Sequence, residues 1–122
     1  MAKVQLGELQ FNYSLAGPIN APVIVFCNGL GANLTMWEPQ VDFFAEKFRV
    51  LTYDQRGHGQ TDVPKKAFQF DDLAYDVVRL IDALDIEKVH FVGLSMGGMT
   101  ALGLAIKHPG RLLSVAASNC VA

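Results

Sequence analysis

The run Val23–Cys27 is the feature that most narrows the folds open to this chain. It consists of five consecutive apolar residues, with Pro22 before it and the turn-forming stretch 28–33 after it. A strand with one face in water alternates apolar and polar residues, whereas an unbroken run of this length is typical of a strand buried on both faces. Such strands occur in parallel sheets that helices cover on each side. We therefore expect an α/β architecture.

The other strand-like segments agree with this expectation. Residues 48–54 and 88–95 are further candidates for buried strands, and residues 111–119 supply a last apolar one. At the N-terminus, residues 9–15 alternate in the manner of a half-buried strand, and residues 3–8 are its expected hairpin partner. The sequence predicts one domain over residues 1–122, with a mostly parallel sheet that an antiparallel hairpin enters.

Helical periodicity separates these strands. Residues 70–86 carry apolar side chains along one stripe, and Asp71 and Asp72 suit a helix start. The stretch after Ser95 is helical in tendency and ends at Pro109. Residues 36–48 are a further candidate helix. The stripe of the first helix consists of Leu73, Val77, Leu80, Ile81 and Leu84.

Composition and charge exclude several classes of function. The 122 residues are 51% hydrophobic, with a formal net charge of -2 and interspersed signs. This charge gives no basic field for nucleic acid, and we interpret the pair Lys65 and Lys66 as solvated surface. No run has the length of a signal-peptide core or a membrane span, so we expect a cytoplasmic protein without membrane contact. Cys27 and Cys120 are expected to be free thiols, because two distant cysteines make neither a disulfide framework nor a zinc site.

A serine lies between glycines where a strand candidate meets a helix candidate. The residues 93–97 read Gly-Leu-Ser-Met-Gly and match the pattern G-x-S-x-G. When this pattern joins a strand to a helix, the sharp turn exposes the serine hydroxyl above the carboxyl edge of the sheet. We therefore interpret Ser95 as a nucleophile. The alternative is a glycine-rich turn that happens to contain a serine.

A second glycine-rich loop follows the first buried strand. Gly29 and Gly31 allow its backbone to approach a substrate carbonyl closely. Acyl transfer needs N–H donors for the oxyanion of the tetrahedral intermediate, and the backbone N–H groups of Leu30 and Met96 are the candidates. The alternative for this loop is an ordinary turn that needs glycine for its geometry alone.

Three segments together resemble the N-terminal half of an α/β-hydrolase-fold enzyme: CNGLG, YDQRGHGQTD and FVGLSMGGMTALGLAIKHPGRL. The resemblance covers essentially the whole chain. Asn28, where many relatives carry histidine, together with GLSMGGMT and the D-x-RGHG run, is more narrowly similar to 3-oxoadipate enol-lactonases.

The resemblance implies roles for individual residues. Ser95 takes the place of the nucleophile, and Met96 and Leu30 supply the oxyanion hole. Arg56 corresponds to a buried ion-pair anchor, with the binding of a substrate carboxylate as its alternative. Asn28 and Trp37 are possible pocket-lining residues, although an aromatic side chain at a helix start also suits the core.

The chain departs from the family pattern after the serine. In this fold the catalytic acid and histidine follow the nucleophile, and only residues 111–122 follow the elbow helix. His58, His90 and His108 do not correspond to the catalytic histidine; His58 is the one to test as a substitute base. The resemblance thus implies a partial domain that lacks the C-terminal strands, the cap, the acid and the histidine.

The family's strand order has two further implications. The last strand would lie inside a larger sheet, so in this chain alone it would be an open edge that favours self-association or a complementary chain. The strands that precede Cys27 and Cys120 would be separated by the Ser95 strand. At the usual spacing the two thiols would then be about 10 Å apart, beyond disulfide reach.

Two functional hypotheses follow from the sequence. In the first, the chain is the nucleophile-bearing half of a serine hydrolase for a small carboxylic ester or lactone, with a carboxylated enol-lactone as the substrate that the narrower resemblance implies. This chemistry belongs to the breakdown of aromatic compounds and needs no metal or organic cofactor. In the second, the chain is a catalytically silent α/β module that binds a ligand or assembles through its open sheet edge.

Overall fold

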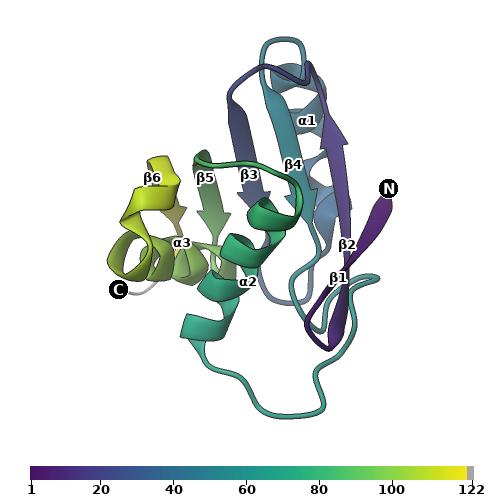
Figure 1. The fold of residues 1–122 in the computed structure, drawn as a ribbon, viewed down its shortest axis with the longest axis vertical. Helices are drawn as coiled ribbons and strands as arrows, with labels where there is room; N and C mark the ends of the chain where they lie inside the picture. Colours follow the sequence, from purple (N-terminus) through teal and green to yellow (C-terminus); the bar gives the residue numbers. More distant parts are fainter. Residues whose placement is uncertain (121–122) are drawn as a thin grey trace.

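A six-stranded mixed sheet forms the centre of the molecule (Figure 1). The computed structural model describes residues 1–120. The strands lie in the order β1-β2-β4-β3-β5-β6; β1 pairs with β2 and β2 with β4 in antiparallel fashion, and the other neighbours are parallel. The predicted α/β class, with an antiparallel N-terminal hairpin before parallel strands, is confirmed. The strands are β1 (Ala2–Leu6), β2 (Leu9–Ala16), β3 (Val23–Cys27), β4 (Arg49–Tyr53), β5 (Val89–Leu94) and β6 (Leu112–Ser118).

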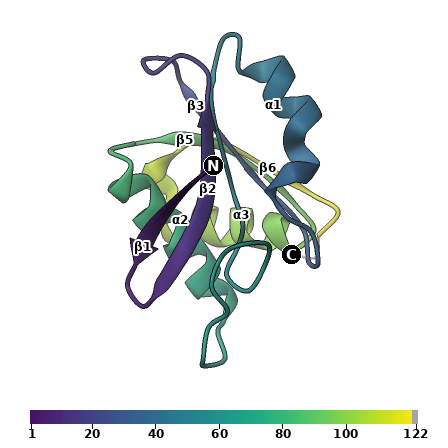
Figure 2. The same cartoon turned by 90° about the vertical axis from the view of Figure 1, so that its right-hand side faces the viewer.

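Helices cover both faces of this sheet (Figure 2). α2 (Phe70–Ala83) and α3 (Met96–Lys107) pack side by side on one face, and α1 (Glu38–Phe44) lies on the other. Two short 3-10 turns, η1 (Leu34–Trp37) and η2 (Pro109–Arg111), precede α1 and β6. The region predicted as one helix over 36–48 is thus divided into η1 and α1, with Pro39 in the first turn of α1.

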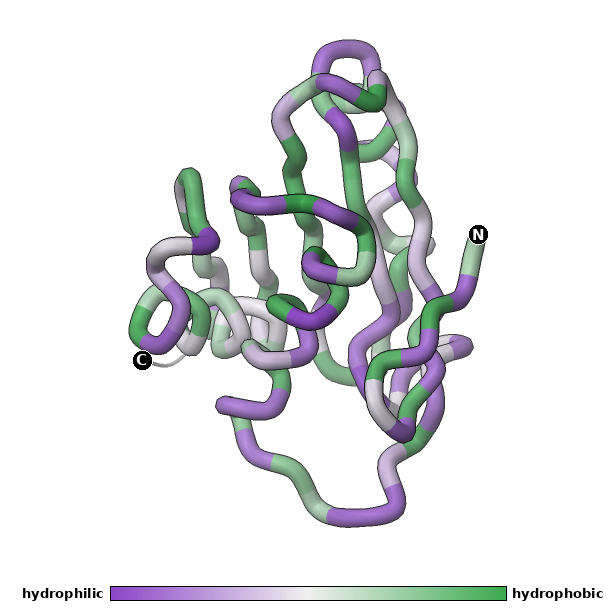
Figure 3. The backbone as a smooth tube through the Cα atoms, in the orientation of Figure 1, coloured by the Kyte–Doolittle hydropathy of each residue, from purple (hydrophilic) through white to green (hydrophobic). Residues whose placement is uncertain are grey.

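The central strand β3 is buried on both faces, as its apolar run predicted. Val25 and Cys27 belong to the core under α2 and α3, whereas Ile24 and Phe26 belong to the smaller core under α1. Figure 3 shows apolar residues along much of the central strands, with hydrophilic residues at the tip of the long connection between β4 and α2. Lys65 and Lys66 lie in that connection and are exposed.

α2 presents the predicted stripe to the core. Leu73, Val77, Leu80 and Ile81 are all at most 2% exposed, while Leu84 lies just beyond the last helical residue and is partly buried. The backbone N–H of Gln69 donates to the Asp72 carboxylate at 2.8 Å, which completes a capping box at the helix start. No helix in the described part of the chain is long and apolar enough to span a membrane.

β6 is an edge strand in the described part of the chain. It pairs with β5 in parallel, and residues 113–119 are all exposed. Leu113 and Val115 are 52% and 42% exposed. The prediction that the last strand is an open apolar edge is confirmed for residues 1–120.

Candidate active site

Ser95 occupies a strained turn between β5 and α3. Its backbone has φ 57° and ψ -114°, a conformation that residues with side chains rarely adopt. The flanking glycines make the turn possible, because a Cβ at Gly93 would collide with the Gly97 carbonyl and one at Gly97 with the Cys27 carbonyl. Ser95 is solvent-exposed, and its N–H donates to the Ser118 carbonyl at 2.8 Å. This strand-turn-helix geometry is the one that exposes a nucleophilic hydroxyl.

The loop after β3 lies against this turn. A Cβ built on Gly29 would be 3.1 Å from Ser95 Cβ and 3.6 Å from Ser95 Oγ. The Asn28 side chain, which is fully buried, donates from Nδ2 to the Gly29 carbonyl at 3.2 Å and to the Ala32 carbonyl at 2.9 Å. These bonds fix the course of the loop where it passes the serine.

Two backbone donors beside Ser95 are free to bind an oxyanion. Among residues 1–120, the N–H groups of Leu30 and Met96 donate to no protein acceptor. Met96 is the first residue of α3, so its N–H also benefits from the positive end of the helix dipole. Leu30 is 76% exposed, so its side chain is not part of the core.

Gln55 connects the loop after β3 to α3. The sequence analysis did not identify this residue. Its side chain is 1% exposed; Nε2 donates to the Asn28 carbonyl at 2.9 Å, and Oε1 accepts from Thr100 Oγ1 at 3.0 Å. The available signal was an amide residue directly after a buried strand, where the main chain reaches the carboxyl edge of the sheet.

The buried side chain of Asp54 holds the start of η1 in place. Its carboxylate is buried and accepts from Asn12 Nδ2 at 2.9 Å, from the Leu34 N–H at 2.7 Å and from the Gln60 N–H at 3.0 Å. The carboxylate also lies over Gly59, where a Cβ would collide with it. The D-x-RGHG run is therefore a structural centre as well as a sequence motif.

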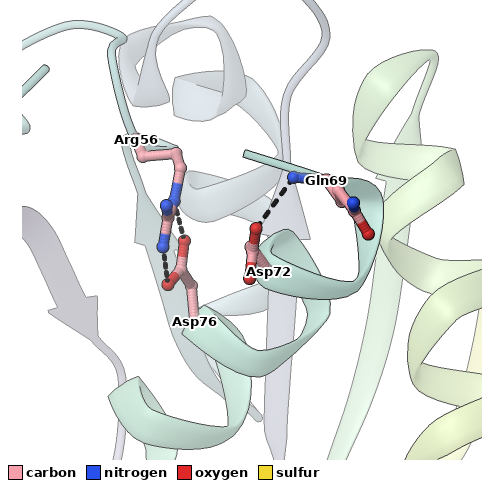
Figure 4. A network of polar contacts seen from close by, with 4 residues as sticks. All are labelled: Arg56, Gln69, Asp72 and Asp76. Atoms are coloured by element: carbon pink, nitrogen blue, oxygen red, sulfur yellow. Dashed lines mark hydrogen bonds and ion pairs between the residues drawn. The ribbon is translucent and has the colours of Figure 1, made fainter. Parts of the chain in front are cut away.

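Arg56 forms a bidentate ion pair with Asp76 of α2 (Figure 4), which confirms its predicted role as an ion-pair anchor. Both N–O distances are 2.7 Å, and the guanidinium also lies over the Phe68 ring at 5.4 Å. Burial raises the pKa of the Asp76 carboxyl, an effect that the bonds from Arg56 offset only in part. Arg56 lines a hollow of about 1050 Å³ beside the β1–β2 turn, and Ser95 is not among the residues of that hollow.

Trp37 is a core residue. Its side chain is 7% exposed and its ring lies 4.9 Å from that of Phe26, centroid to centroid, in the core under α1. Within the described residues, Trp37 Nε1 has no hydrogen-bond acceptor, and Gln40 Oε1 has no hydrogen-bond donor. The alternative interpretation given from the sequence, a core aromatic at a helix start, describes this placement.

The two cysteines are free thiols, as predicted. β5 lies between β3, which ends at Cys27, and β6, which ends shortly before Cys120, in agreement with the expected order. Cys27 is fully buried, and burial raises its pKa to about 12 although its Sγ lies within hydrogen-bond distance of Tyr53 Oη, at 3.2 Å. Cys27 is therefore a packing residue and not a second nucleophile.

A family profile described as the alpha/beta hydrolase fold matches residues 22–120, which include both β3 and the serine turn. The chain belongs to the alpha/beta hydrolase fold family. Its resemblance to the N-terminal half of such enzymes is thus confirmed.

Lactone-degrading enzymes are among the similar members of the alpha/beta hydrolase family. The 3-oxoadipate enol-lactonase 1 of Acinetobacter baylyi is 50% identical over 106 residues, which are 87% of this chain and 40% of that protein. The enol-lactonase from Burkholderia xenovorans LB400 has a TM-score of 0.94 and 41% identity over 98% of this chain and 46% of that one. Est816, an N-acyl homoserine lactone degrading enzyme, has a TM-score of 0.88 and 33% identity over 93% and 43%. The chain spans less than half the length of these relatives.

The three histidines of this alpha/beta hydrolase chain have partners other than the serine. His58 Nδ1 lies 3.1 Å from the Arg56 carbonyl, His90 Nδ1 lies 2.7 Å from Ser114 Oγ, and the His108 ring stacks on Tyr75. In the part of the chain that the structure describes, Ser95 Oγ hydrogen-bonds to no histidine and no carboxylate.

Proposed function

We propose that this chain is the nucleophile-bearing part of a serine hydrolase that cleaves a carboxylic ester or lactone. One observation carries the proposal: Ser95 sits in a strained turn beside two backbone N–H groups, of Leu30 and Met96, that have no protein acceptor within residues 1–120. A glycine-rich turn that merely contained a serine would not need a second loop held against it. Hydroxyl and free donors together are what acyl transfer requires.

The proposed reaction has two stages. Ser95 Oγ attacks the carbonyl carbon and loses its proton to a base, and the resulting oxyanion accepts hydrogen bonds from the N–H groups of Leu30 and Met96. Collapse of the intermediate breaks the acyl–oxygen bond, and the protonated base gives its proton to the leaving oxygen. The products are an acyl-serine and an alcohol or enol, which remain one molecule when the substrate is a lactone. Water then attacks the acyl-serine and releases the carboxylic acid.

The base is proposed to be a histidine outside the described residues, oriented by an acid, because the three histidines of this chain have other partners. The acid, the cap and the remaining strands are likewise proposed to belong to the part of the enzyme that these relatives have beyond the length matched here. Without a base, a serine hydroxyl is a poor nucleophile at neutral pH.

We propose a small carboxylated enol-lactone as the substrate. The similarity to two enol-lactonases supports this choice, and in such a substrate the released enol becomes a ketone, which draws the reaction forward. Arg56 is not proposed to hold the substrate carboxylate, because Asp76 engages its guanidinium at two atoms.

A second candidate is a catalytically silent module that pairs through β6, either with a complementary chain or with another copy. The exposed edge, with Leu113 and Val115 open to solvent, favours this candidate.

The decisive experiment is the intact mass of the protein before and after exposure to a fluorophosphonate, with Ser95→Ala as control. One adduct that disappears in Ser95→Ala supports the hydrolase. A measured mass above 13.3 kDa would place the base in a continuation of the chain. If no adduct forms at 13.3 kDa, the hydrolase proposal fails for this chain and the silent module is favoured.

A matched pair of lactones tests the proposed substrate class. We expect faster hydrolysis of α-angelica lactone, an enol-lactone, than of γ-valerolactone, which has the same ring and methyl group but no enol. Equal rates would contradict the preference for enol-lactones without affecting the role of Ser95.

A further inference from the structure

We infer that Gln55 is a positioning residue for the oxyanion hole: its buried amide sets the distance between the Leu30 N–H on one loop and the Met96 N–H on α3. The inference rests on the proposed function for its catalytic consequence. Its structural part stands on contacts that are independent of catalysis.

The orientation of the Gln55 amide is determined by its neighbours. The Asn28 carbonyl only accepts hydrogen bonds, so the amide nitrogen must face it, at 2.9 Å. The oxygen then faces the Thr100 hydroxyl, at 3.0 Å. Because Gln55 is 1% exposed, water does not replace either bond, and the side chain acts as a fixed spacer between loop and helix.

On the loop side, the spacer acts on two consecutive peptide planes. Gln55 holds the carbonyl of Asn28, and the Asn28 side chain holds the carbonyl of Gly29. The peptide bond is planar, so fixing the Gly29 carbonyl also fixes the direction of the Leu30 N–H in the same plane. The Gly29 carbonyl also accepts from the Ala32 N–H at 3.3 Å, so Gln55, through Asn28, and this turn together determine the direction of the Leu30 N–H.

On the helix side, the spacer acts on the first turn of α3. Thr100 lies one turn after Met96, and its hydroxyl is also 3.2 Å from the Met96 carbonyl. Gly97 packs directly on the carbonyls of Cys27 and Asn28, so the loop and the helix start are in contact. Gln55 thus links the loop that carries the Leu30 N–H to the helix that carries the Met96 N–H, beside the contact that Gly97 makes.

The test compares variants that remove the spacer without removing volume. Gln55→Met loses both hydrogen bonds, and Thr100→Val loses only the helix-side bond, whereas Thr100→Ser keeps it. Leu80→Ala, in the core of α2, controls for general destabilisation. Each variant is made in the same form of the protein as the one used for the fluorophosphonate experiment. Its rate of phosphonylation is measured well below its melting temperature.

A misplaced donor affects the transition state more than the ground state. We expect Gln55→Met to slow phosphonylation of Ser95 about 10- to 100-fold and Thr100→Val about threefold, with Thr100→Ser near wild type. For ester hydrolysis the loss should appear in kcat, with KM changed less than about twofold. Equal losses in Leu80→Ala, or a loss confined to KM, would overturn the inference.

A second readout separates this inference from the proposed function. In backbone 15N relaxation, the order parameter of Leu30 should fall from about 0.85, the value of a rigid backbone, to below about 0.6 in Gln55→Met. The order parameter of Phe26 in β3 should stay unchanged. If the wild type forms no adduct, the proposed function fails and this measurement alone decides. An unchanged Leu30 in Gln55→Met would refute the role of the spacer.

Discussion

The Cys27 thiol makes the stability of this fold sensitive to alkaline pH. Burial raises its pKa from the ordinary value of 9.0 to about 12, so the unfolded chain releases the thiol proton at lower pH than the folded chain does. The stabilisation is complete below pH 9 and is lost as the pH rises toward 12, by about 1.4 kcal/mol per pH unit within that window. Between pH 8.5 and 10.5 the free energy of unfolding should fall by about 2 kcal/mol through this one group.

Urea unfolding at the two pH values measures this loss. Trp37 is the single tryptophan and is buried, so its fluorescence reports the transition. Other groups also titrate in this range, among them Tyr53, whose pKa is raised by burial and by the adjacent Cys27. Cys27→Ala keeps these groups and lacks the thiol; the wild type should therefore lose about 2 kcal/mol more than this variant, or roughly 8 °C in Tm for a chain of this length. Cys120→Ala, at the less buried thiol, should behave like the wild type. An equal loss in Cys27→Ala and wild type would refute the reasoning.

Three further predictions follow from packing and charge. Gly97→Ala places a Cβ against the Cys27 carbonyl, so we expect unfolding to become easier by about 1–3 kcal/mol and phosphonylation of Ser95 to slow about 100-fold; an unchanged rate would contradict the close approach of loop and helix. Asp54→Asn removes the charge from a buried carboxylate that accepts three hydrogen bonds and should lower the free energy of unfolding in urea by about 2–4 kcal/mol. A cost below about 1 kcal/mol would mean that these bonds are weak. Val115→Lys puts a charge on the exposed β6 edge and should shift the sedimentation-velocity distribution toward the monomer, with the free energy of unfolding changed by less than about 0.5 kcal/mol. Unaltered association would place the contact between copies elsewhere.

The elements that depend on local pattern were predictable from the sequence. The unbroken run of β3 predicted burial on both faces, and the structure divides its side chains between two cores. The stripe of α2 predicted its buried face, although the helix ends at Ala83, before Leu84, where the chain turns and Asp85 takes a positive φ. Both features follow from which residues avoid water, a property that sequence shows directly.

Long-range polar contacts were not predictable in the same way. Gln55 lies in the polar turn that follows β4, and its partners are 27 and 45 residues away. Nothing in the spacing of a glutamine indicates a carbonyl on one segment and a hydroxyl on another. Trp37 shows the same difficulty, since only the packing of its ring on Phe26, which the sequence does not show, decides between pocket and core.

The hydrogen bond from the Ser95 N–H to the Ser118 carbonyl has a consequence for engineering. It makes the last residue of the exposed strand β6 one of the supports of the strained serine. We expect fraying of that strand end to loosen the serine backbone, and a strand added along β6 to stiffen it. If Ser95 is the nucleophile that we propose, binding at the sheet edge changes its reactivity, which is the property needed in a split reporter whose signal depends on the joining of two fragments.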